Sequence, residues 1–486
     1  MSNPIKKLLG QTAVYGLSSI IGRLLNYLLV PLYTSVFADP SDYGVVSELY
    51  AWVAFLVVFL TFGMETTFFR FIQDQEDKEK VFRNSFITVI GVNVLFFFAL
   101  IFFNQDIADL MLYSNHNEYI ILLGAIVCID AITALPLAKL RAEEKAFQFA
   151  GIQFASIGVN IILNLILMLV VFDPTRPEEG VLFILFANLI ASLVKPLLLY
   201  KHFFNLRFNF DMQLAKTMLI YALPLVIAGF AGIVNETIDR ILLKHMLYDG
   251  INAASLTYAE GQVGIYSACY KLAMLVTILL QAYRYAAEPF FFAQFKNEDK
   301  NKIYAKVMNI FIAAVCLVFL VVSLNIDIFK EFIRNEAYHE GLYVVPILLL
   351  ANVFLGIYYN QSIWYKLSGQ TKFGAYIAIG GAFLTILINV LFIPTYGFEA
   401  SAWATLIVYA FQMVASYLLG QKYYPIKYNL RKFMLYLGLA IFLFLFAKLI
   451  GLENIIARLV FHNLLIAIYI GLVYSIEKSA FKKSSI

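Results

Sequence analysis

One stretch near the start of the chain identifies the class of protein. Residues 42–72 read DYGVVSELYAWVAFLVVFLTFGMETTFFRFI, and residues 45–72 are mostly apolar. About 20 helical residues cross a bilayer core, so this segment predicts a membrane-spanning helix. It nevertheless carries Glu65 and Arg70. A charge inside a bilayer costs about 2.5–3.5 kcal/mol on insertion scales, and a segment that accepts this cost is expected to border a wet cavity.

Long apolar segments of this kind fill the chain. Of its 486 residues, 62% are hydrophobic and 14% are charged, whereas soluble domains carry about 25% charged residues. We therefore predict an all-α polytopic membrane protein with about 14 transmembrane helices. The expected spans are residues 9–36, 45–72, 82–103, 118–140, 147–172, 180–203, 214–245, 262–292, 303–326, 341–366, 373–394, 398–421, 431–450 and 456–476.

The distribution of basic residues predicts the orientation of these spans. Most of the 36 Lys and Arg residues lie at the two termini and in the even-numbered connections. The opposite side carries few, namely Arg176, Lys244, Lys330, Arg334, Lys448 and Arg458. By the positive-inside rule, both termini are expected in the cytoplasm.

Five further basic residues lie inside the apolar segments, on the first, second, seventh and eighth spans: Arg23, Arg70, Arg240, Lys271 and Arg284. Ionisable residues within membrane spans commonly mark pathways for substrates or ions. Their recurrence on corresponding helices of two halves predicts an ion-lined cavity. We interpret the chain as a transporter of something large and at least partly anionic.

Short motifs recur at an offset of about 220–227 residues. Asp-Tyr-Gly at 42–44 matches Gln-Val-Gly at 262–264, and Asn164 matches Asn389. Six spans return the chain to its starting side, so the two repeats have the same orientation. We predict a six-helix lobe at 1–210, a second at 211–425 related by a pseudo-two-fold along the membrane normal, and two additional helices with a cytoplasmic tail at 426–486. Such repeats enclose a central site.

With this organisation the whole chain resembles the multidrug/oligosaccharidyl-lipid/polysaccharide (MOP) exporter superfamily, and within it the polysaccharide-type (Wzx-like) flippases. The local features that carry the resemblance are Tyr15-Gly16-Leu17, Asp42-Tyr43-Gly44, Gly63-Met64-Glu65 followed by Arg70, Tyr221-Ala222-Leu223-Pro224-Leu225 and Asp239-Arg240. The resemblance implies transfer of undecaprenyl-pyrophosphate-linked oligosaccharide, such as an O-antigen or other surface polysaccharide repeat unit, from the inner to the outer leaflet of a bacterial cytoplasmic (inner) membrane. It also implies a cavity lined by helices one, two, seven and eight.

The intramembrane charges fall into candidate roles. We assign substrate binding to Arg23, Lys271, Arg284 and Glu65, because Arg makes bidentate phosphate contacts and Lys acts as a point charge. Structural ion pairs with Glu65, Asp130 or Glu236 are the alternative for the first two. The gating or ion-pair candidates are Arg70, Glu288, Glu236, Asp239 and Arg240, and Arg284 is also a candidate for a gate at the cytoplasmic side. Asp130, in the middle of span four, is the candidate for proton or sodium coupling, or an ion-pair partner within its own lobe.

Other functions are less well supported by the sequence. A cation-coupled drug exporter of the same superfamily and a lipid II flippase are the alternatives. A membrane polysaccharide polymerase or ligase usually has a large external loop, whereas the longest outer connection expected here, residues 246–261, is short. No catalytic residue, cofactor or metal site is expected, apart from a possible H+ or Na+ coupling ion. The expected partners are the polyprenyl-linked glycan, membrane lipids and other polysaccharide-assembly membrane proteins, without nucleic acid.

Overall fold

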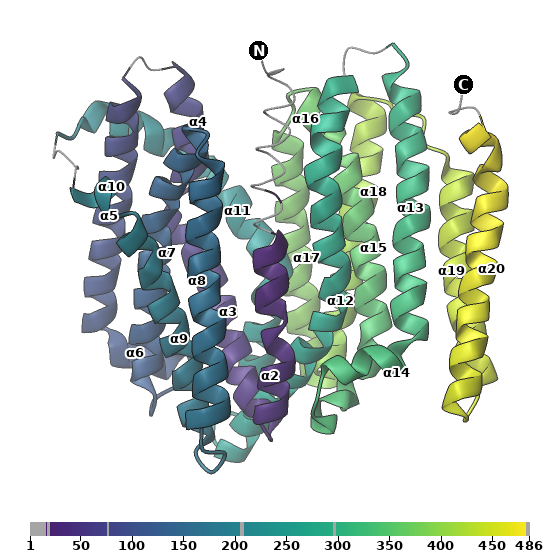
Figure 1. Cartoon of the computed structure of the whole chain (residues 1–486), viewed down its shortest axis with the longest axis horizontal. Coiled ribbons are helices and arrows are strands. Elements are labelled where there is room, and N and C mark those ends of the chain that lie inside the picture. The colour runs from purple at the N-terminus through teal and green to yellow at the C-terminus, as the bar shows by residue number, and fades with distance from the viewer. Residues whose placement is uncertain (1–15, 17–19, 75–76, 205–208, 295–297, 483–486) are drawn as a thin grey trace. The chain divides into compact units, whose positions relative to one another are not determined.

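The computed structural model describes residues 16, 20–74, 77–204, 209–294 and 298–482 (Figure 1), which form helices and no strand. The elements are α2 (Leu29–Val36), α3 (Pro40–Thr61), α4 (Met64–Asp74), α5 (Lys78–Phe102), α6 (Asn104–Leu110), α7 (Asn117–Ala142), α8 (Ala146–Ile166), the π-helical η1 (Leu167–Val171), α9 (Pro177–Leu198), α10 (Tyr200–Phe204), α11 (Met212–Leu247), α12 (Ala253–Ala293), α13 (Lys300–Leu324), α14 (Ile326–Phe329), the 3-10 helices η3 (Lys330–Phe332) and η4 (Glu336–Val344), α15 (Val345–Gln361), α16 (Ile363–Leu367), α17 (Lys372–Tyr396), α18 (Phe398–Tyr423), α19 (Leu430–Ile450) and α20 (Ile455–Lys482).

Thirteen described helices are long and apolar enough to cross a membrane, and a shorter apolar helix covers Ile20–Val36. The shorter helix is the end of the first predicted span, most of whose earlier residues lie outside the described part of the chain. Exposed side chains such as Leu95, Phe102 and Leu449, which are 73%, 82% and 84% exposed, fit a surface that faces lipid. The predicted all-α membrane fold is confirmed.

Two boundaries differ from the prediction. The second span is not one helix, because Phe62 and Gly63 adopt left-handed backbone conformations with φ values of 52° and 63° and separate α3 from α4. Glycine adopts this conformation freely, whereas a residue with a Cβ pays about 1–2 kcal/mol for it. The eighth span begins at Ala253 rather than at residue 262, so the expected outer loop at 246–261 is largely helical.

The chain forms two compact units, residues 1–267 and 268–486. In the first unit α7 packs against α3, α5 and α9, while α8 packs along α9, and α11 lies along α3 with further contacts to α4 and α5. In the second unit α15 packs against α13 and α18, and α18 lies along α17. The helices α19 and α20 lie side by side and both contact α13 (Figure 1). The division into lobes at residues 210 and 425 stays a prediction.

Capping residues set where the helices of the first unit begin. The Asp39 carboxylate accepts a hydrogen bond of 2.8 Å from the backbone N–H of Ser41, and Pro40 follows in the first turn of α3. The Asp211 carboxylate accepts one of 3.0 Å from the N–H of Leu214 at the start of α11. A side chain that satisfies the free N–H groups of a first helical turn typically contributes about 1 kcal/mol. Asp39 and Asp211 thereby determine where α3 and α11 begin, and these two helices carry residues of the candidate site.

Candidate functional site: a polar cavity and a buried charge cluster

A polar cavity lies inside the first unit, within the membrane-spanning segments. Its volume is about 330 Å³, which is room for roughly ten water molecules at about 30 Å³ each. It is lined by residues from the Ile20–Val36 helix and from α3, α7, α8 and α9, among them Gly22, Arg23, Asn26, Tyr50, Asp130, Gln153, Ser156, Asn160, Asn188, Ser192 and Lys195. The structure therefore brings two of the predicted residues, Arg23 and Asp130, to one cavity.

The charges of this cavity do not cancel. Lys195 donates a hydrogen bond of 2.9 Å to the Asp130 carboxylate, and the two side chains are 17% and 29% exposed. Arg23 is exposed on the same cavity. Two cations face one carboxylate, so the site has a net positive charge and suits an anionic ligand. The sequence suggested two roles for Asp130, ion coupling or an ion pair within its own lobe. The contact with Lys195 is such an ion pair.

Neutral donors and acceptors complete the cavity wall. Asn188 donates to the Tyr50 hydroxyl at 2.5 Å, and Ser156 donates to the backbone carbonyl of Ala191 at 2.7 Å. Gln153 also lines the space. Amide and hydroxyl groups can exchange hydrogen bonds with the polar groups of a ligand as well as with water, so the cavity wall offers neutral polar contacts beside its charged ones.

A second cluster, largely buried, involves Glu48, two residues before the cavity residue Tyr50 on α3. The Lys244 Nζ lies 3.0 Å from a Glu48 oxygen and 3.2 Å from a Glu260 oxygen, and it donates to the carbonyl of Met111 at 3.1 Å. Neither Lys244 nor Glu48 exposes more than 1% of its side chain. Tyr113 also donates a hydrogen bond to Glu48. Burial raises the pKa of the Tyr113 hydroxyl well above its usual value, so it remains a donor at physiological pH.

The first part of α12 crosses α3 at two glycines. A Cβ on Gly44 would lie 1.9 Å from the carbonyl oxygen of Glu260, and a Cβ on Gly264 would lie 1.9 Å from that of Pro40. The two contacts involve corresponding residues, because Gly264 lies 220 residues after Gly44 and Glu260 lies 220 residues after Pro40. Reciprocal contacts of this kind are the mark of a two-fold relation, and these two glycines end the first pair of matching motifs in the sequence.

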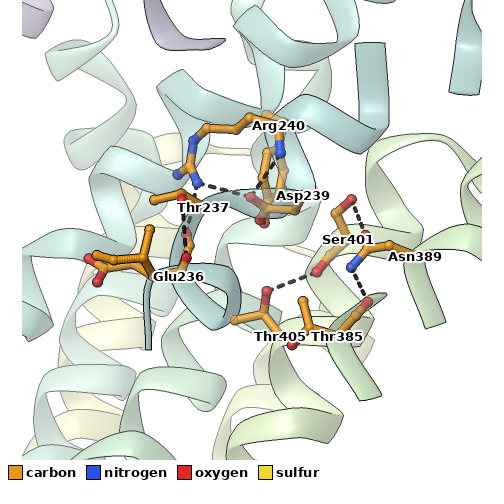
Figure 2. A network of polar contacts seen from close by, with 10 residues as sticks. Glu236, Thr237, Asp239, Arg240, Thr385, Asn389, Ser401 and Thr405 are labelled. Carbon is orange, nitrogen blue, oxygen red and sulfur yellow. Dashed lines mark hydrogen bonds and ion pairs between the residues drawn. The ribbon is translucent and has the colours of Figure 1, made fainter. Parts of the chain in front are cut away.

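The matched asparagines repeat a local arrangement as well. Asn164 donates at 2.8 Å to the carbonyl of Asn160 and accepts at 2.9 Å from the Tyr33 hydroxyl. Within the second unit, Asn389 donates at 2.8 Å to the carbonyl of Thr385 and accepts at 2.8 Å from the Ser401 hydroxyl (Figure 2). In both halves, therefore, the asparagine side chain donates a hydrogen bond to the backbone carbonyl four residues earlier and accepts one from a hydroxyl group.

The other predicted residues of the first unit lie in different surroundings. Glu65 forms an ion pair with Arg141, a partner that the sequence did not suggest. Arg70 is exposed, and so is the Glu236 side chain. Arg240 contacts the Asp239 carboxylate at 3.0 Å and the backbone carbonyl of Glu236 at 2.9 Å (Figure 2). The structure thus joins the two sequence neighbours Asp239 and Arg240 to each other.

A hydroxyl group completes the Asp239 site. Tyr266 donates to the second oxygen of the Asp239 carboxylate at 2.6 Å. In the second unit, Lys271 is half-buried and the Arg284 guanidinium lies 4.3 Å from the centre of the Tyr359 ring. The Glu288 side chain lies outside the described part of the chain. The assignment of these residues to substrate binding or gating stays a prediction.

The sequence did not single out the residues of the buried cluster. Lys244 was counted among the bases of the side opposite the termini, and the structure places it in the last turn of α11 with its side chain 0% exposed. Glu260 fell in the expected outer loop and Glu48 near the start of a span. The available signal was the i, i+4 spacing of Arg240 and Lys244 on one long helix together with acidic residues that had no assigned partner.

A family model described as "Polysaccharide biosynthesis protein" matches residues 8–295. The chain belongs to this family. Two relatives from Haemophilus influenzae match over 294 residues, 60% of this chain: an "Uncharacterized membrane protein", 21% identical over 66% of its length, and "Lsg locus putative protein 1", 20% identical over 68% of its length. The matched part spans about two thirds of these relatives.

Solved structures extend the likeness to the whole fold. The structure titled "Lipid II flippase MurJ, inward closed conformation" aligns with a TM-score of 0.73 at 14% identity, covering 95% of this chain and 98% of that one. An inward-facing multidrug resistance MATE family transporter of the MOP superfamily aligns with a TM-score of 0.62 at 16% identity, covering 85% and 94%. The polysaccharide biosynthesis protein has the fold of MOP-superfamily transporters, and the predicted resemblance is confirmed.

Proposed function

We propose that this protein moves a polyprenyl-pyrophosphate-linked oligosaccharide from the inner to the outer leaflet of a bacterial cytoplasmic membrane. The observation that carries the proposal is the net-positive polar cavity at Arg23, Asp130 and Lys195 inside a membrane-spanning lobe. Membership of the polysaccharide biosynthesis protein family supports it. Transport of this kind needs no covalent chemistry, and the protein acts as a transporter rather than an enzyme.

The cavity serves the charged headgroup, while the polyprenyl tail stays in lipid. Arg23 contacts a phosphate oxygen through its guanidinium, which can donate two parallel hydrogen bonds. Lys195 is held by Asp130 and adds a second positive charge at the wall. Asparagine and glutamine side chains exchange hydrogen bonds with the sugar. Lys271, Arg284 and Glu65 contribute contacts as the headgroup moves on.

The buried cluster at Lys244 acts as a gate. It ties α3 to α11 and to the first part of α12, and these helices must part if a path is to open between them. Asp239, Arg240 and Glu236 belong to the same gating region. Arg70 in the first unit, and Arg284 and Glu288 in the second, are separate candidates for a gate at the other side of the membrane. Alternating access follows from opening one gate while the other is closed.

Asp130 is the point at which an ion couples to transport. Protonation of its carboxylate, or a Na+ beside it, weakens the contact with Lys195 and frees that ammonium for the anionic cargo. Both termini lie in the cytoplasm, as the distribution of basic residues indicates. Other membrane proteins of polysaccharide assembly supply and receive the lipid-linked glycan.

A leaflet-transfer assay tests the proposal. The purified protein is reconstituted into vesicles with a fluorescent polyprenyl-pyrophosphate oligosaccharide, and transfer is followed by quenching from outside. Arg23→Ala and Lys195→Ala should each lower the transfer rate by at least tenfold. Lys422→Ala, which changes an exposed lysine of the second unit, is the matched control and should transfer normally. Full transfer by both cavity variants contradicts the proposal.

The same vesicles separate the alternative functions. A drug exporter of this fold would move an organic cation instead of the glycan lipid, and a lipid II flippase would move lipid II in preference to other cargo. The expected result is transfer of the oligosaccharide lipid and neither of the other two. Uptake of the cation alone contradicts the proposed cargo.

A further inference from the structure

A large basic pocket lies at one end of the first unit, away from the polar cavity. Its volume is about 720 Å³, within the range of about 300–1,000 Å³ usual for ligand sites. It is formed by the first turns of α5, the turn between α7 and α8, and α10, and is lined by Glu79, Phe82, Arg83, Lys139, Glu143, Lys145, Gln148, Leu198, Tyr200, Lys201 and His202. The basic connections place this end on the side that we propose to be cytoplasmic.

Two of the four Lys and Arg residues of the pocket are already neutralised. Lys139 binds both oxygens of Glu79 at 2.8 and 2.7 Å, and Lys145 lies 2.7 Å from Glu143. The Lys201 ammonium, by contrast, has no acidic partner among the described residues, and its contact is with the Tyr200 ring at 5.9 Å. A positive charge therefore remains available to a ligand.

Arg83 supplies a second available cation. Its Nε donates at 2.7 Å to the backbone carbonyl of Asn209, which orients the guanidinium and leaves its terminal nitrogens without an acidic partner in the described part of the chain. His202 stands beside them, packed edge-on against Phe82. Burial, together with the nearby Lys139 ammonium, lowers the pKa of His202. At neutral pH the ring is thus an uncharged hydrogen-bonding group.

The rim of the pocket on its membrane side is apolar. Leu198 and Tyr200 are 47% and 50% exposed, and the neighbouring Leu197 and Phe147 are 70% and 83% exposed. Aromatic and aliphatic side chains at the level of lipid headgroups are common at the edge of a membrane protein. An anion bound between Lys201 and Arg83 would therefore be joined to an apolar surface next to it.

We propose that this pocket binds the phosphate group of an anionic phospholipid from the adjacent leaflet, with Lys201 and Arg83 as the phosphate contacts and the Leu198–Tyr200 rim against the acyl chains. Two cations without an acidic partner among the described residues, placed around one monovalent phosphodiester and beside an apolar rim, are the features of a headgroup site. The binding does not depend on the proposed transport function; only the leaflet assignment rests on the proposed orientation.

Native mass spectrometry of the purified protein in detergent tests the site. Phosphatidylglycerol, phosphatidylcholine and inorganic phosphate are the three probes. Phosphatidylglycerol should bind, Lys201→Ala should weaken that binding about fivefold, and Lys201→Arg should retain it. The control is Lys422→Ala, an exposed lysine whose ammonium lies 5.5 Å from the ring of the following Tyr423, and it should bind like the parent protein.

Three results would overturn the proposal. Equal affinity of Lys201→Ala and the parent protein for phosphatidylglycerol would remove the pocket as the binding site. Equal binding of phosphatidylcholine would mean that the charge of the lipid is not recognised. Displacement of the bound lipid by a large excess of inorganic phosphate would mean that the pocket takes free phosphate instead of a lipid. An unchanged melting temperature for Lys201→Ala would show that the loss of binding is not a loss of folding.

Discussion

Replacement of Lys244 by methionine should release the packing of α3 against α11 and α12. Methionine keeps most of the length of the side chain but removes the ammonium that lies 3.0 Å from Glu48 and 3.2 Å from Glu260. The two carboxylates then stay buried without a counter-charge. Tyr113 can still donate to Glu48, but one neutral donor does not replace a shared cation.

The size of the effect follows from the burial of the cluster. Removing one partner of a buried ion pair costs about 3–5 kcal/mol, because the other charge is left uncompensated. The Lys244 and Glu48 side chains are 0% and 1% exposed, so solvent does not screen this cost. At about 1.4 kcal/mol per factor of ten, the equilibrium between the packed and parted helices should shift by at least a hundredfold.

The shift can be measured with a thiol reporter. Val263 is 0% exposed at the crossing of α12 and α3, and Val263→Cys is close to it in volume. In a background in which the three native cysteines are replaced, a water-soluble thiol reagent should label Val263→Cys slowly. Addition of Lys244→Met should raise the labelling rate about a hundredfold or more.

A variant in which both carboxylates are also neutralised distinguishes the loss of the counter-charge from a general loss of stability. Lys244→Met combined with Glu48→Gln and Glu260→Gln leaves no unpaired charge, and replacing a whole buried ion cluster by neutral groups is often nearly neutral in stability. Its labelling rate should return toward that of the parent. Slow labelling of the Lys244→Met variant, equal to the parent, would refute the reasoning.

Three further outcomes are expected. Gly44→Ala should lower the melting temperature clearly, since its Cβ meets backbone at 1.9 Å, whereas Gly91→Ala, with nothing within 4 Å, should not lower it; equal melting temperatures would contradict the crossing. Glu477→Ala should cost about 1.5–3 kcal/mol of unfolding free energy measured in detergent, because its buried carboxylate accepts charge-assisted bonds. NMR titration should give His202 a midpoint below pH 6.5, because burial and then the Lys139 charge lower its pKa, and Lys139→Gln should raise that midpoint. The stability that the neutral ring contributes is present above pH 6.5 and is lost as the pH falls.

The membrane fold could be read from the sequence because the spans follow from length and apolar composition alone. The break at Phe62 and Gly63 could not, because Gly63 permits the left-handed conformation but only tertiary packing holds Phe62 in it. Likewise, Arg23 and Asp130 were recognisable as costly charges in apolar segments. Their meeting at one cavity depends on how helices distant in sequence pack together.

The burial of Lys244 could not be predicted from the sequence pattern around it. Lys244 lies four residues from the start of the connection after α11, a position at which lysine usually extends to the membrane interface. It is buried because Glu48, which is 196 residues earlier in the chain, meets it. Charge near a helix end therefore predicts solvent exposure only where no distant carboxylate is brought to the same place.

The paired glycines also bear on how such a chain can arise. Two identical copies meeting about an axis would make the Gly44 and Gly264 contacts twice from one sequence, as expected if the gene duplicated and fused. The acidic residues of the Lys244 cluster do not follow this two-fold relation. At the same offset of 220, Glu48 corresponds to Ala268 and Glu260 to Pro40. In a fused chain each half can change alone, and the Lys244 cluster, which a dimer of identical copies would contain twice, is found once among the described residues.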